Sequence, residues 1–268
     1  MPHTAVAKPI STSVLERFEG SIAVHAMPMQ VRIGPRTSAV RISAEYREIV
    51  CGDAIPWLRA SCDDAHADKR AGLSVVTSLP DVSEVDLDLA SWRAWFLDAA
   101  ALCVRAADRR CATIFFQTDI KRDGRTVDKG ALVVRAAEDA GASVLFHKVV
   151  CRRPPGHTTF GRPAFTHLVA VSFEARAPGI VSVPDVIVDA GRLTWARAMG
   201  MRACSDAVRF ARDCTPTTTI ADPFCGVGTV PAVANALGLA AIGVERSKKR
   251  CERARALVVT EADIARAL

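Results

Sequence analysis

The chain has 268 residues, of which 50% are hydrophobic, enough for one large domain or one domain with a small appendage. No apolar run reaches the ~20 residues that a membrane-spanning helix needs, and the N-terminus lacks the hydrophobic region of a secretory signal peptide. We therefore expect no membrane partner. The formal charge of +6 and the pI of about 9.0 favour a polyanionic partner, although many basic proteins bind no polyanion.

The N-terminal part of the chain carries no recognisable motif. We expect residues 1–44 to form an extension and residues 45–268 to form the main domain. Apolar stretches at residues 22–27 and 30–33 are compatible with a hairpin around Pro28, in which case the extension would be a small β lobe.

Nine cysteines are scattered along the chain without the spacing of a zinc site, so we expect no metal. Most lie within apolar runs, as reduced buried cysteines do, which indicates a reducing compartment and an intracellular, cytoplasmic protein. Acidic residues are absent before Glu16, so a cleaved organelle transit peptide stays open as an alternative.

Strands and helices alternate from Tyr46 onward, which predicts an α/β fold with a mainly parallel sheet. The first predicted strand, residues 48–54, ends in Gly52-Asp53, and a buried strand at residues 73–77 is followed by Ser78-Leu79-Pro80-Asp81. Ligands of open α/β sheets bind at the carboxyl ends of the strands, so Asp53 and Asp81 are candidate site residues.

An amphipathic helix is predicted at residues 90–107, and a buried strand at residues 112–116 follows it. Trp92, Trp95 and Phe96 recur at helical spacing along this helix. We expect these three rings in the hydrophobic core rather than in a platform that stacks on bases.

Two basic loops follow. The first, residues 120–125, precedes a helix at residues 129–140, and the second, residues 151–163, joins two strands that we expect to be antiparallel at the edge of the sheet. Basic side chains bind phosphates and aromatic rings stack on bases, so both loops are candidate nucleic-acid contacts, with a solvated rim as the alternative. The candidate substrate-binding residues are Lys121, Arg122, Arg125, Arg152, Arg153, His157, Phe160 and Arg162.

The most informative stretch lies near the C-terminus. Gly226 and Gly228 follow a short buried strand and allow a tight turn that approaches a ligand closely. A helix at residues 230–237 and a strand at residues 240–244 come next, and the strand ends on Glu245. These segments form a nucleoside-binding βαβ unit in which Glu245 accepts hydrogen bonds from ribose hydroxyls.

This turn resembles the S-adenosylmethionine (AdoMet) loop of nucleic-acid amino-methyltransferases through the sequence Asp222-Pro223-Phe224-Cys225-Gly226-Val227-Gly228-Thr229. The resemblance implies a Rossmann-like AdoMet-dependent methyltransferase fold, with the ribose of AdoMet held by Glu245. The loop residues implied to hold the cofactor are Asp222, Pro223, Phe224, Cys225, Gly226, Gly228 and Thr229. An unliganded turn between strand and helix is the alternative.

The nucleoside-binding unit comes last in the chain, and this order resembles the circularly permuted, beta-class amino-methyltransferases over roughly residues 48–258. In that family a helix before the AdoMet strand contacts the methionine moiety. The resemblance implies this role for Trp195, on a helix that we expect to start at Leu193, and Asp53 is counted as a further cofactor contact.

The family's catalytic motif, Asp/Asn/Ser-Pro-Pro-Tyr, corresponds by resemblance to Ser78-Leu79-Pro80-Asp81. Ser78 and Asp81 are therefore the candidate catalytic residues, with a carboxylate in place of the family's aromatic ring. That replacement leaves methylation of an exocyclic amine open, and Asp81 either acts on the nucleophile or caps the next helix. The tetrapeptide holds no cysteine, which disfavours methylation at carbon 5 of pyrimidines.

DNA enzymes of this family usually insert a recognition domain before the AdoMet-binding helix, whereas only residues 174–191 are available here. We therefore favour an AdoMet-dependent methyltransferase that modifies RNA, with a transfer RNA base as the preferred target and a role in tRNA processing. The alternatives are methylation of a protein, a small molecule or a DNA amino group, or a catalytically inactive RNA-binding subunit. The oligomeric state stays open.

Overall fold

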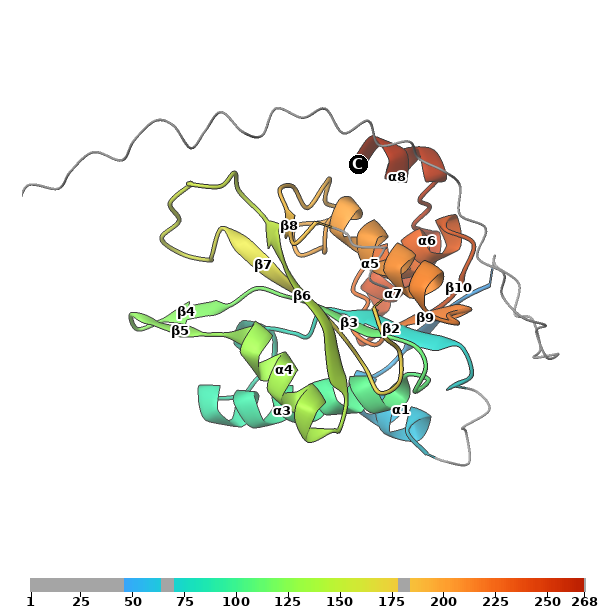
Figure 1. Cartoon of the computed structure of the whole chain (residues 1–268), viewed down its shortest axis with the longest axis horizontal. Coiled ribbons are helices and arrows are strands. Elements are labelled where there is room, and N and C mark those ends of the chain that lie inside the picture. The colour runs from blue at the N-terminus through green and yellow to red at the C-terminus, as the bar shows by residue number, and fades with distance from the viewer. Residues whose placement is uncertain (1–45, 64–69, 178–183, 268) are drawn as a thin grey trace, which may run out of the picture. The chain divides into compact units, whose positions relative to one another are not determined.

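The computed structural model describes residues 46–63, 70–177 and 184–267, which belong to one compact unit of the chain (Figure 1). The predicted extension at residues 1–44, with its hairpin, lies outside the described residues. No helix in the described ranges is long and apolar enough to cross a membrane.

An eight-stranded sheet has the order β1-β10-β9-β2-β3-β7-β6-β8. Strands β1, β10, β9, β2 and β3 are parallel, and β7 runs antiparallel between β3 and β6. The predicted α/β fold, mainly parallel with an antiparallel side, is confirmed. The strands are β1 (Arg47–Cys51), β2 (Leu73–Thr77), β3 (Thr113–Gln117), β6 (Ser143–Cys151), β7 (Phe165–Ser172), β8 (Val186–Ile187), β9 (Thr219–Asp222) and β10 (Ala240–Glu245).

Helices cover both faces of this sheet, with α1, α3 and α4 on one side and α5 and α6 on the other (Figure 1). Every residue of β2, β3 and β9 is buried, as expected for strands covered on two faces. The helices are α1 (Ala54–Ser61), a 3₁₀ helix (Val82–Glu84), α3 (Leu89–Ala106), α4 (Lys129–Asp139), α5 (Met201–Cys214), α6 (Thr229–Ala236), α7 (Lys248–Ala256) and α8 (Glu261–Ala267).

The first basic segment is a hairpin, not the loop that we predicted. Strands β4 (Ile120–Arg122) and β5 (Arg125–Val127) pair with each other in a separate two-stranded sheet. The turn residues Asp123 and Gly124 have φ values of 51° and 72°. Asp-Gly is a favoured sequence for such a two-residue turn, so the signal was present in the sequence.

The predicted helix from Leu193 is also wrong. Helix α5 begins only at Met201, because Gly200 has a φ of 88°, outside the helical region. Trp195 and Arg197 therefore belong to an irregular segment that precedes the helix. Because the backbone of this segment is irregular, the two side chains reach the carboxyl edge of the sheet without the fixed angular spacing of residues in a helix.

Candidate functional site

The turn between β9 and α6 depends on two glycines in left-handed conformation, Gly226 with φ 55° and Gly228 with φ 84°. A Cβ on Gly228 would lie 2.8 Å from the Cβ of Ala254, and one on Gly226 would lie 3.0 Å from the ring of Trp195. Because any side chain here would combine backbone strain with a steric clash, the turn must contain glycine at both positions.

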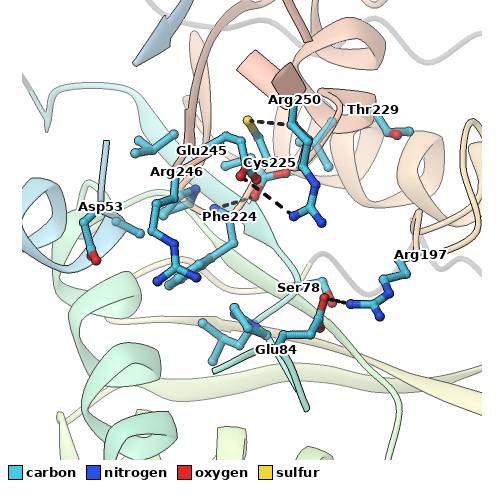
Figure 2. A pocket seen from close by; sticks show the side chains of 18 of the residues that line it. Asp53, Ser78, Glu84, Arg197, Phe224, Cys225, Thr229, Glu245, Arg246 and Arg250 are labelled. Carbon is cyan, nitrogen blue, oxygen red and sulfur yellow. Dashed lines mark hydrogen bonds and ion pairs between the residues drawn. The ribbon is translucent and has the colours of Figure 1, made fainter. Parts of the chain in front are cut away.

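This turn forms one wall of a cavity of about 230 Å³ at the carboxyl ends of β1, β2, β9 and β10 (Figure 2). Ser78 and nine of the ten predicted cofactor contacts line it, and Gly228 does not. The nine are Asp53, Trp195, Asp222, Pro223, Phe224, Cys225, Gly226, Thr229 and Glu245.

Glu245 stands at the end of β10 as predicted, with its side chain only 10% exposed. Its Oε1 accepts a hydrogen bond of 2.7 Å from the backbone N of Ser247 and lies 3.8 Å from a guanidinium nitrogen of Arg250. Within the described residues no partner is found for Oε2. One carboxylate oxygen is thus held in place while the other remains available to a ligand.

Asp53 lies two residues beyond Cys51, the last residue of β1, which pairs with Glu245 of the parallel neighbour β10. Its Oδ1 accepts a hydrogen bond of 2.8 Å from the backbone N of Ile55 and so caps α1. The cap fixes the position of the carboxylate at the cavity wall.

Asp222 is buried beneath the turn. Its Oδ1 accepts hydrogen bonds from the hydroxyl of Thr77 at 2.7 Å and from the backbone N of Phe224 at 3.2 Å. Burial, with a smaller contribution from the charge of Glu245, raises the pKa of Asp222 to about 7 despite these two hydrogen bonds. Asp222 therefore joins β9 to β2 and supports the first residues of the turn.

Several cavity residues were missed by the sequence analysis. Trp95, predicted in the core with Trp92 and Phe96, is only partly buried and packs edge-on against Phe224 with ring centroids 6.1 Å apart. Trp92 and Phe96 are buried in the core as predicted. The remaining missed residues with charged side chains are Glu84, Arg197, Arg246 and Arg250.

A second, smaller cavity shares a wall with the first. Both are lined by Ser78, Leu79, Glu84, Arg197, Ala198 and Met199. Within this wall Arg197 forms an ion pair with Glu84, and Figure 2 shows the pair beside Ser78. Ser78 is thus the candidate catalytic residue that faces both spaces.

Asp81 lines only the second cavity, and its carboxylate already has two contacts. Its Oδ1 accepts a hydrogen bond of 2.8 Å from the backbone N of Val82, and its Oδ2 lies 3.6 Å from the guanidinium of Arg162. Glu84 completes the cap by accepting a hydrogen bond from the backbone N of Asp81 at 3.0 Å. The capping role that the sequence left open is therefore present.

The candidate nucleic-acid contacts divide into two groups. Arg152 and Arg162 line the second cavity. The others line neither cavity and are surface residues, among them Phe160, which is 96% exposed. This outer group consists of Lys121, Arg122, Arg125, Arg153, His157 and Phe160.

No protein-family model matches the chain, and no curated protein matches its sequence. Solved structures do match its fold, which is the Rossmann-like fold of AdoMet-dependent methyltransferases. At identities below 20%, the likeness establishes the fold alone.

Three of these structures illustrate the match. The PvuII DNA methyltransferase, which is cytosine-N4-specific, matches with a TM-score of 0.59 and 13% identity over 85% of this chain and 94% of its own. TTHA0409 of Thermus thermophilus, assigned as a DNA modification methylase and complexed with S-adenosyl-L-methionine, matches with 0.54 and 18% over 83% and 95%. The M1.HpyAVI–SAM complex matches with 0.52 and 14% over 78% and 98%.

Asp222 should make the stability of the protein depend on pH. Between the ordinary pKa of 3.8 and about 7, the unfolded chain releases the proton that the folded chain retains. The free energy of unfolding should therefore fall as pH rises through this window. Asp222→Asn keeps the oxygen that accepts from Thr77 but cannot titrate. The free energy of unfolding of this variant, measured by urea denaturation, should therefore fall less between these pH values than that of the native protein. Parallel pH profiles for the two proteins would show that Asp222 is ionised when folded.

Proposed function

We propose that this protein is an AdoMet-dependent methyltransferase whose acceptor is a base in a nucleic acid. The observation that carries the proposal is the pair of cavities that meet at Ser78. One contains the glycine turn and Glu245, the acid that we assign to the ribose hydroxyls. The other is lined by the basic side chains of Lys129, Arg152 and Arg162.

The larger cavity suits AdoMet. Glu245 has a free carboxylate oxygen for ribose hydroxyls, and the aromatic rings of Phe224 and Trp195 contribute apolar surface to the cavity. The solved complexes of similar fold contain S-adenosyl-L-methionine. When bound, AdoMet supplies an activated methyl group for direct displacement, and the protein contributes by holding the acceptor in line with it.

DNA is the acceptor class that we propose. The preference for RNA was based on the short connector at residues 174–191, which leaves no room for a recognition domain. That reason does not hold, because the alignment with PvuII DNA methyltransferase covers 94% of the PvuII chain. A DNA enzyme of this fold therefore needs no large segment beyond what this chain contains.

The segment order supports the permuted arrangement. Strand β9, which carries the glycine turn, comes late in the chain but lies between β10 and β2 in the sheet. In our proposal residues 45–268 form the methyltransferase domain, with the acceptor-binding wall encoded before the cofactor turn. Ser78 and Asp81 face the acceptor cavity and orient the nucleophile.

The activity is tested with labelled AdoMet and with total DNA and total RNA from cells that lack this protein. We expect label in DNA, and nucleoside mass spectrometry of the digested product identifies the methylated base. Label in RNA alone would contradict the DNA assignment and return the target to RNA. Transfer to neither polymer would favour the inactive, nucleic-acid-binding subunit.

Glu245→Ala should weaken AdoMet binding by about 1–3 kcal/mol, or roughly 5- to 150-fold in Kd, because it removes the acceptor of the ribose hydrogen bonds. Calorimetric titration with AdoMet measures the change. Glu252→Ala is the matched control, since Glu252 is an exposed glutamate on α7 that does not line the cavity. Equal affinities in the two variants would place the ribose elsewhere.

Asp81→Asn should lower the turnover number by roughly 10²–10⁴ if the carboxylate accepts a proton from the nucleophile. Asparagine can still cap the 3₁₀ helix, so folding and AdoMet affinity should stay unchanged. The measurement is single-turnover methyl transfer at saturating AdoMet. Near-normal turnover would mean that Asp81 only shapes the loop through its contacts with Val82 and Arg162.

A further inference from the structure

Lys129 is a buried cation in the wall of the second cavity. It is the first residue of α4, is only 3% exposed, and was expected from sequence only to start a helix. Its Nζ lies 5.5 Å from the ring centroid of Phe96 and 5.8 Å from that of Trp92. Lysine is rarely buried to this extent unless it is paired or binds a ligand.

A charged hydrogen-bond network holds this lysine in position. Its backbone N donates to Oδ1 of Asp119 at 2.9 Å, and Nε2 of His167 lies 3.0 Å from the same oxygen. Nδ1 of His167 is in turn 2.8 Å from Nε2 of His147. Burial alone would lower the pKa of His167, but the hydrogen bond and charge of Asp119 outweigh it, so this pKa is raised.

The same contacts act on Asp119 with the opposite sign. Burial would raise its pKa, but the hydrogen bonds from His167 and from the backbone of Lys129 outweigh burial and lower it. Both members of the pair thus favour their charged forms. Asp119, Asp128 and His167 bring ligand atoms within 4.8 Å of one another, but Asp128 caps α4 through the backbone N of Ala131. We interpret this cluster as the anchor of α4.

The cavity carries an excess of positive charge. Arg197 is paired with Glu84, and Arg162 lies 3.6 Å from Asp81. In the part of the chain that the structure describes, neither Lys129 nor Arg152 has a carboxylate within 4.0 Å. Two cations therefore remain without a direct counterion around one small space.

The pKa values of both cations are lowered. For Lys129 the cause is burial, which outweighs the longer-range attraction of Asp81 and Glu84, and the charge of Arg162 adds a smaller effect in the same direction. The pKa of Arg152 is lowered by burial and by the charges of Arg162 and Arg153. An anion in the cavity would relieve the repulsion and compensate the desolvated ammonium.

We propose that the second cavity binds a phosphate group of the acceptor nucleic acid, with the ammonium of Lys129 and the guanidinium of Arg152 as its principal ligands. Ammonium and guanidinium groups are the standard partners of phosphate, and the hydroxyls of Ser78 and Thr118 line the same space. Phosphate contacts position a nucleic acid without reading its sequence. Since the second cavity shares a wall with the larger cavity, which we assign to AdoMet, a phosphate there would hold the acceptor beside Ser78.

The inference rests on the proposed function only for the origin of the phosphate, so inorganic phosphate is the first probe. Calorimetric titration at constant ionic strength compares the full-length protein with Lys129→Met and with Lys249→Met, whose exposed lysine lies on α7 outside both cavities. We expect one saturable site in the native protein, binding at least tenfold weaker in Lys129→Met, and unchanged binding in Lys249→Met. Equal binding in all three proteins would mean an adventitious ion only and would overturn the proposal.

A second measurement links the site to nucleic acid. For mixed-sequence duplex DNA, the slope of log affinity against log salt should fall by about 0.9 in Lys129→Met, the value for one lost phosphate contact. An unchanged slope would overturn the assignment of the phosphate to the acceptor backbone.

The thermal midpoint of Lys129→Met serves as the control for correct folding. It should equal or exceed that of the native protein, because methionine replaces a desolvated charge with apolar volume. If this variant fails to fold, Arg152→Gln tests the same site from an exposed position and should also bind phosphate more weakly.

AdoMet titration of each variant separates the two proposals. Normal AdoMet binding without a phosphate site overturns only this inference, and a phosphate site without AdoMet binding overturns only the methyltransferase assignment.

Discussion

Close packing around the turn between β9 and α6 is the constraint on which the rest of the site depends. The turn lies against Trp195 on one side and Ala254 of α7 on the other, and the backbone N of Cys225 donates to the carbonyl of Val244 at 3.0 Å. A Cβ on Gly243 of β10 would lie 2.8 Å from the sulfur of Cys225. A side chain at position 226, 228 or 243 would therefore force its neighbours to shift, and the shape of the larger cavity depends on this close approach of segments.

The two cavities differ in the sign of their most buried charge. Glu245 and Asp222 lie at the larger one, whose lining arginines are exposed or partly exposed, whereas the buried Lys129 and the exposed Arg152 give the smaller one a positive excess. The raised pKa of Asp222 favours its neutral form and so limits the repulsion between the two acids. The wall at Ser78 and the Glu84–Arg197 ion pair lies between these two environments. Such a division suits a cationic cofactor on one side and a polyanionic acceptor on the other.

The elements that were predicted correctly are those whose signals lie in neighbouring residues of the chain. Strand β2 occupies residues 73–77 as predicted, because a short, mostly apolar run with two valines indicates a strand buried on both faces. The helix that starts at Lys129 and the acid at the end of β10 were also predicted from neighbouring residues in the chain. The segment before α5 was predicted wrongly because its residues have acceptable helix propensity. Its conformation is set by Gly200, which packs against the backbone of Ala190.

The sequence by itself determined the α/β alternation, the glycine turn with its terminal acid, and the candidate residues at the strand ends, because each depends on neighbours in the chain. Only the tertiary structure decided which of these residues share a cavity. Trp95 could not be separated from the core residues Trp92 and Phe96 by spacing, since all three fit one helical stripe. Lys129 looked like an ordinary first residue of a helix, and its burial follows from the packing of α3, β3 and β7 around α4. Burial and charge balance depend on contacts between distant segments, which no local pattern records.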